Sequence, residues 1–88
     1  MKTDPSRKQT LRRAILDKLG ATAPHALPEV TLLVALRFDL RPEPQEPEFA
    51  DALLYLHGRG YIRAMEEDLD ETRLKWFITE PGKTLLKQ

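Results

Sequence analysis

The chain has 88 residues and no cysteine, which allows one domain and excludes a disulfide framework, a thiolate zinc site and a cysteine nucleophile. Its 41% hydrophobic and 32% charged residues are typical of a globular protein, and its formal net charge of zero lacks the basic excess usual in nucleic-acid binders. No apolar run reaches the roughly 18 residues that span a bilayer, and residues 1–8 lack the apolar core of a signal peptide. We therefore expect a soluble, cytoplasmic domain with no membrane partner.

The first predicted helix covers residues 5–19. Asp4 is a suitable N-cap, and Pro5 has the fixed φ that suits a first helical turn. Gly20 is expected to end the helix, because glycine adopts the left-handed conformation common just past a helix. The apolar stripe with helical period is formed by Leu11, Ala14, Ile15 and Leu19.

The second predicted helix covers residues 28–38, and the connection before it, residues 21–27, leaves room for a short strand. This helix is apolar on almost every side, and such a helix is normally buried on several sides. The β-branched pair Val30 and Thr31 also permits a strand, but the 3.6-residue period favours a helix.

The third predicted helix covers residues 46–58 and follows a connection in which Pro42 and Pro44 exclude regular structure. Gly58 and Gly60 are expected to end it. Its inward stripe is formed by Phe49, Ala52, Leu53 and Leu56.

Two β-like runs complete the pattern, within a predicted wing at residues 61–79. Alternation is clear in the second run, where Trp76 and Ile78 face one way and Lys75 and Phe77 the other. The runs are joined by an acidic segment, residues 68–72, and a last short helix is predicted at residues 80–87.

The order of three helices, a hairpin and a short helix resembles that of winged-helix domains. The segment ALLYLHGRGYI, residues 52–62, resembles the end of a winged-helix recognition helix followed by the turn into the first wing strand. The segment WFITEPGKTLL, residues 76–86, resembles the second wing strand and following turn of small bacterial winged-helix transcription regulators, with Thr79 beginning the turn. The resemblance implies a single, mostly α domain over residues 1–88 with a small antiparallel β hairpin or sheet.

The resemblance also implies binding of double-stranded DNA and a role in transcription regulation. On this interpretation Tyr55 meets a DNA groove, and the recognition-helix face is formed by Glu48, Asp51 and Ala52. Ala52 is thus assigned both to this face and to the inward stripe of the third helix. The alternative without a functional role is that the two carboxylates belong to an ordinary solvated helix face. The residues expected to reach phosphates are Arg59, Arg63, Arg73 and Lys75.

These four cations have a structural alternative, which is cross-strand pairing with Glu66, Glu67 or Glu71. The distribution of charge along the chain bears on whether these cations bind DNA. Residues 1–41 carry eight basic and four acidic side chains, whereas residues 42–72 carry two basic and nine acidic ones. The part expected to meet DNA is therefore the acidic part.

A second hypothesis is a winged helix that associates with proteins and does not bind DNA. The zero net charge and the acidic wing favour it, and several leucines lie off the predicted stripes. We expect a homodimer whose interface uses the surplus faces of the first two helices, at Leu16, Leu32 and Leu36. An enzyme is the least expected class, because no metal-ligand spacing, phosphate-binding loop or nucleophile motif occurs. No cofactor and no small-molecule ligand are expected.

Overall fold

The computed structural model describes residues 5–67 and 70–87, with side chains at residues 7–65 and 74–87. The strands form one antiparallel sheet in the order β1-β3-β2, which confirms a mostly α fold with a small antiparallel sheet. The elements in chain order are α1 (Pro5–Thr22), β1 (Leu27–Pro28), α2 (Glu29–Asp39), α3 (Glu46–Gly58), β2 (Ile62–Glu67), β3 (Asp70–Ile78) and α4 (Glu80–Leu86).

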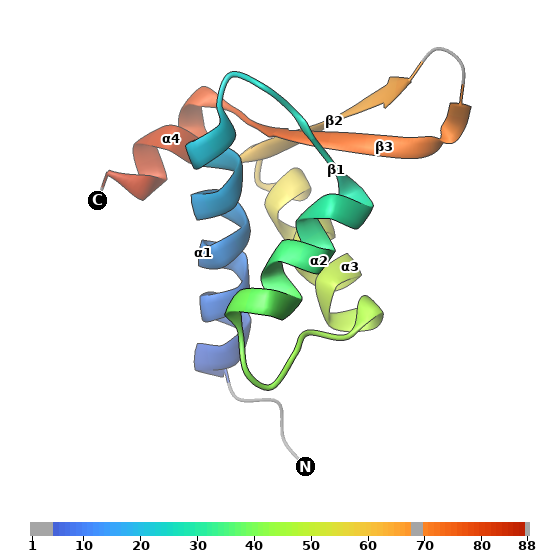
Figure 1. The fold of residues 1–88 in the computed structure, drawn as a ribbon. Coiled ribbons are helices and arrows are strands. Elements are labelled where there is room, and N and C mark those ends of the chain that lie inside the picture. Colours follow the sequence, from blue (N-terminus) through green and yellow to red (C-terminus); the bar gives the residue numbers. More distant parts are fainter. Residues whose placement is uncertain (1–4, 68–69, 88) are drawn as a thin grey trace.

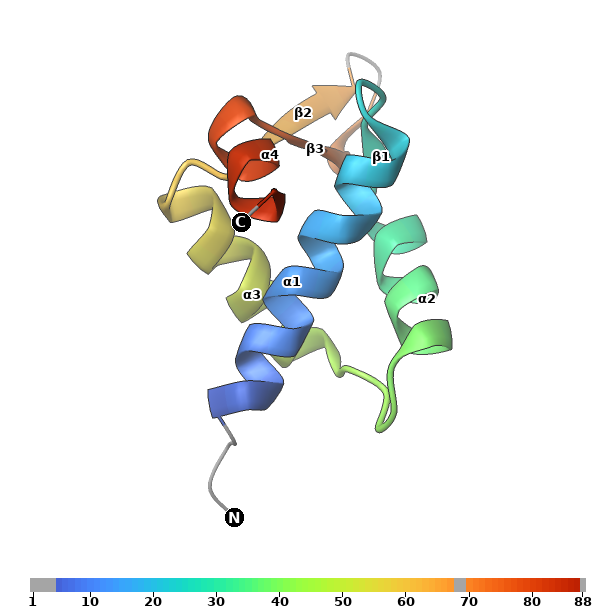
Figure 2. The same ribbon diagram turned by 90° about the vertical axis from the view of Figure 1, so that its left-hand side faces the viewer.

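The helices form a bundle below the sheet, and the strand pair β2–β3 reaches beyond the bundle as a ribbon (Figure 1). In the view turned by 90°, α1 crosses between α2 and α3, and α4 lies beside α1 near the sheet (Figure 2). Within the described residues, no helix is long and apolar enough to cross a membrane.

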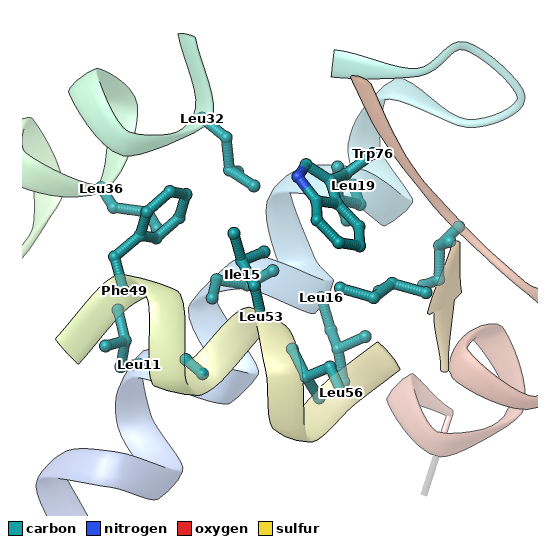
Figure 3. Packing of buried hydrophobic residues seen from close by; sticks show 13 residues of the cluster. Leu11, Ile15, Leu16, Leu19, Leu32, Leu36, Phe49, Leu53, Leu56 and Trp76 are labelled. Carbon is teal, nitrogen blue, oxygen red and sulfur yellow. The ribbon is translucent and has the colours of Figure 1, made fainter. Parts of the chain in front are cut away.

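One hydrophobic core joins the three long helices to the sheet, and Leu16, Leu32 and Leu36 belong to it (Figure 3). They are between 0% and 2% exposed, so the expectation that these leucines form a surplus interface is wrong. The physical reason for the burial of Leu16 is that α1 packs against α2, α3, α4 and β3, so that more than one side of this helix is covered. The other buried side chains are Leu11, Ile15, Leu19, Phe49, Ala52, Leu53, Leu56, Ile62, Trp76 and Ile78.

Gly20 lies inside α1 rather than at its end, because the helix continues to Thr22. A Cβ atom at Gly20 would lie 2.8 Å from Cδ1 of Leu86 in α4. The glycine therefore permits close approach of the two helices, which the prediction of a helix end at this position missed.

The helix predicted at residues 28–38 is α2, displaced by one residue at each end. One of its faces is uncovered, which contradicts the expectation of burial on several sides. Val30, Val34 and Phe38 recur every four residues and are 74%, 60% and 82% exposed. We refer to these three side chains as the α2 apolar stripe.

A compact junction attaches the ribbon to α3. Gly60 has a φ of +78°, a conformation that glycine adopts without strain, and it turns the chain from α3 into β2. The Thr79 hydroxyl donates to the Gly60 carbonyl oxygen at 2.6 Å and accepts from the Gly82 amide at 3.3 Å. The prediction that Thr79 begins the turn into the last helix is confirmed, since Thr79 is the N-cap of α4.

Candidate nucleic-acid interface

Helix α3 has one buried face and one uncovered face. Pro47 lies in its first turn, where a missing amide hydrogen costs nothing, and Gly58 is its last residue. The buried face carries the predicted inward stripe, so Ala52 lies in the core and its assignment to the recognition-helix face is wrong. The exposed positions are Glu46, Pro47, Ala50, Asp51, Leu54, Tyr55, His57 and Gly58.

Glu48 is half-buried and binds Arg7 of α1. Arg7 donates from Nε to Oε2 of Glu48 at 2.8 Å and from Nη2 to Oε1 at 3.1 Å. The same Nη2 donates to the Pro42 carbonyl oxygen, and the Gln45 amide donates to Oε1 of Glu48. Glu48 therefore fastens α3 to α1 and to the proline-rich connection. Its side chain stays about one third exposed and lines the same groove as Asp51 and Tyr55, so its assignment to the recognition-helix face stays a prediction.

The pKa of Glu48 is lowered, first by the hydrogen bond from Arg7 and then by the Gln45 amide. A lowered pKa in the folded state stabilises the protein above the ordinary value near 4.5, and this contribution is lost as pH falls through the folded pKa. We expect Glu48→Gln to destabilise the protein at pH 7 but much less at pH 3. Urea unfolding at both pH values checks this, and an equal loss at both would contradict it. The matched control is Asp51→Gln, an exposed carboxylate on the same helix.

Tyr55 lies between two arginines at the boundary of α1 and α3. The Cζ atom of Arg12 is 3.5 Å from the Tyr55 ring centroid, and that of Arg59 is 5.1 Å away. Tyr55 and Arg59 are thus brought together as sequence analysis grouped them, while Arg12 was not among the predicted site residues. The spacing of Lys8 and Arg12 by four residues, which places both on one helix face, was the signal available in the sequence.

A groove of about 540 Å³ runs between α1 and α3 beside Tyr55. Asp51 lines it and is exposed, as predicted. The other lining residues are Lys8, Leu11, Arg12, Pro47, Glu48, Ala52, Leu54 and Tyr55.

Arg63 and Lys75 lie apart from Tyr55, on the sheet. Arg63 pairs with Phe77 and Met65 pairs with Lys75 in the β2–β3 register, so Arg63 and Lys75 share one sheet face. This face is opposite the one that carries Trp76 into the core. The side chain of Arg73 and those of the acidic hairpin residues lie outside the described part of the chain.

Comparison with solved structures identifies the fold. No family model and no curated protein matches the chain. The MepR F27L mutant of S. aureus, solved with a bound oligodeoxyribonucleotide, superposes with a TM-score of 0.74 at 19% identity, covering 88% of this chain and 51% of MepR. PcaV, a transcriptional regulator of Streptomyces coelicolor solved with its natural ligand, gives 0.69 at 21% identity, covering 98% and 51%. TA0346 of Thermoplasma acidophilum gives 0.79 at 15% identity, covering 98% and 80%.

The chain spans about half the length of MepR and of PcaV. Both are winged-helix transcription regulators of the MarR family. The superposition includes the three long helices and the ribbon, since it covers nearly the whole chain. The chain therefore has the winged-helix fold of transcription regulators.

Proposed function

We propose that the protein is a non-catalytic regulator that binds double-stranded DNA with α3 in the major groove. The observation that carries the proposal is the match of 88% of the chain to a MepR structure that holds an oligodeoxyribonucleotide. The major groove, about 12 Å wide, admits an α-helix. A DNA-binding regulator works where DNA is, which agrees with a cytoplasmic location.

The uncovered face of α3 suits this role in shape and chemistry. Leu54 is 72% exposed and can contact a thymine methyl group, while the Asp51 carboxylate can accept from a cytosine amino group. Ala50 and Gly58 are small residues, so no large side chain protrudes from the rest of this face. On this proposal Tyr55 lies at the edge of the groove, and Arg59, Arg63, Arg73 and Lys75 supply phosphate contacts.

Binding of a labelled duplex measured by fluorescence anisotropy tests the proposal. We expect a dissociation constant in the micromolar range or tighter at low salt, with a log–log salt slope that grows by about 0.9 for each phosphate neutralised. The double variant Arg59→Glu and Arg63→Glu is expected to abolish DNA retention, because it replaces two exposed cations that are proposed to meet phosphates with two anions that repel them.

The matched control reverses the same amount of charge at Lys83 and Lys87 in and after α4, away from α3. We expect this control to bind DNA within a few-fold of the unmodified protein. Equal losses in both double variants would mean that net charge alone governs retention. No retention of the unmodified protein at low salt would overturn the proposal.

We also propose that the protein is a homodimer whose interface is the α2 apolar stripe. A two-fold axis beside α2 would place Val34 against the partner's Val34 and bury Phe38 in both copies. Exposed apolar side chains on one helix face mark an interaction surface when they adjoin one another. Three side chains bury less accessible surface than the roughly 800 Å² that each partner buries in a standard interface. The dimer is therefore expected to be weak.

Light scattering at high micromolar concentration tests the dimer. We expect a dimeric mass for the unmodified protein and a monomeric mass for Val34→Glu, with unchanged circular dichroism. Leu54→Glu is the control, since it places the same charge on an exposed leucine of α3. A monomeric mass of the unmodified protein at these concentrations would exclude this interface.

A further inference from the structure

Two guanidinium groups meet at one tyrosine ring. Arg12 comes from α1 and Arg59 follows the last residue of α3, yet both lie against Tyr55. Among the side chains that the structure describes, neither arginine has a carboxylate or carbonyl partner. We call these three residues the Arg12–Tyr55–Arg59 cluster.

Other arginines of the bundle are satisfied by oxygen atoms of the protein. Arg7 binds Glu48, and Arg13 pairs with Asp17 at 3.5 Å and donates to the Leu86 carbonyl oxygen. Arg37 donates to the Pro44 carbonyl oxygen. The lack of oxygen partners at Arg12 and Arg59 is therefore a local property of the cluster rather than a general feature of the bundle.

Contact with the ring orients the two guanidiniums and leaves their donors available. A cation–π contact uses the face of the aromatic ring, whereas the five N–H groups of each guanidinium lie in its own plane. Two positive charges beside one ring repel each other, and an anion with several acceptor oxygens binds both at once. Phosphate has this chemistry, and arginine is well suited to it.

The surroundings of the cluster are positive although the protein as a whole is neutral. Lys8 lines the same groove one turn before Arg12. Of the two carboxylates that line it, Glu48 is neutralised by Arg7, whereas Asp51 has no cationic partner among the side chains that are described. Lys8, Arg12 and Arg59 together carry three positive charges against the single negative charge of Asp51, which leaves an excess of two positive charges. Leu54 and Asp51 line this groove and also belong to the uncovered face of α3.

We propose that the Arg12–Tyr55–Arg59 cluster holds a DNA backbone phosphate beside the major groove, so that α1 takes part in DNA binding together with α3. This inference rests on the proposed DNA binding and adds Arg12, a residue of another helix, to the interface. A helix seated in the major groove has backbone phosphates along both of its edges. The cluster lies along one edge of α3, and Tyr55 stacks both arginines before the phosphate arrives.

The salt dependence of duplex binding separates this phosphate contact from a purely structural role. We expect Arg12→Gln to lower the log–log salt slope by about 0.9 and to weaken binding roughly tenfold at 0.1 M salt. Arg59→Gln is a second variant with the same expected change. Tyr55→Phe keeps the ring and is expected to bind as the unmodified protein does.

The matched control is Arg13→Gln, which removes the same charge from the next residue of α1 but from a side chain that binds Asp17. We expect the slope of this control to remain unchanged. If the unmodified protein binds DNA and Arg12→Gln behaves like Arg13→Gln, the phosphate site is overturned while DNA binding stands. If the unmodified protein does not bind DNA at low salt, both proposals fail together.

Discussion

Replacement of Leu16 by glutamate is expected to unfold the protein rather than to separate a dimer. Leu16 belongs to α1, is 2% exposed and points into the hydrophobic core (Figure 3). Burial of an unpaired carboxylate costs several kcal/mol, and the leucine contacts are lost as well. A domain of this size has a free energy of unfolding of only about 4–13 kcal/mol, so this one substitution removes much of it.

Circular dichroism and urea unfolding check this result. The control is Val34→Glu, which places the same charge on an exposed side chain of α2 and is expected to leave the helical signal unchanged. The milder variant Leu16→Ala is expected to lower the free energy of unfolding by about 2–5 kcal/mol. A folded Leu16→Glu variant with unchanged stability would contradict the burial of Leu16 in the core.

Replacement of Gly82 by alanine is expected to lower the free energy of unfolding by about 1–3 kcal/mol. The added Cβ atom would lie 2.3 Å from the Tyr61 carbonyl oxygen and 2.7 Å from Cγ1 of Ile78. The Tyr61 carbonyl cannot move away freely, because it accepts from the Thr79 amide at 3.0 Å. The substitution therefore strains the junction that attaches the ribbon to α3.

Gly58→Ala is the matched control for this prediction. A Cβ atom at Gly58 meets no atom within 4 Å, and alanine is favoured over glycine in a helix by about 0.5–1 kcal/mol. Urea unfolding is expected to show opposite signs for the two glycine-to-alanine substitutions. A stabilised Gly82→Ala variant would mean that Tyr61 and Ile78 leave more space around Gly82 than the structure shows.

Local sequence signals predicted most elements, because each long helix contains its own period and its own boundary residues. The helix predicted at residues 46–58 has the bounds of α3, which follow from Pro47 at its start and Gly58 at its end. Thr79 was predicted as the start of the last turn for the same kind of reason. These signals act within a few residues and need no knowledge of the rest of the chain.

The errors arose where a distant segment decides the environment of a residue. Leu16 is off the predicted stripe of α1, but α1 packs against elements from the rest of the chain, and Leu16 belongs to their common core. Gly20 has the sequence signal of a helix end, although its real partner is Leu86. The pairing of Glu48 with Arg7 was not predicted, because nothing nearby in the sequence indicates it.

The candidate site was predicted only in part for the same reason. Tyr55 and Arg59 are four residues apart and could be grouped from the sequence, whereas Arg12 joins them through the packing of α1 on α3. The surplus apolar surface was assigned to Leu16, Leu32 and Leu36, which are buried. It lies mainly on the α2 apolar stripe, because Leu32 and Leu36 of the same helix face the core.

Trp76 is the one tryptophan of the chain, and its position makes it an intrinsic optical reporter. Its indole is 8% exposed in β3, and Nε1 donates to Oε1 of Glu29 in α2 at 3.0 Å. A red shift of its emission would therefore signal that β3 has separated from α2 and exposed the indole to water. A fluorescence titration can follow that event on unlabelled material.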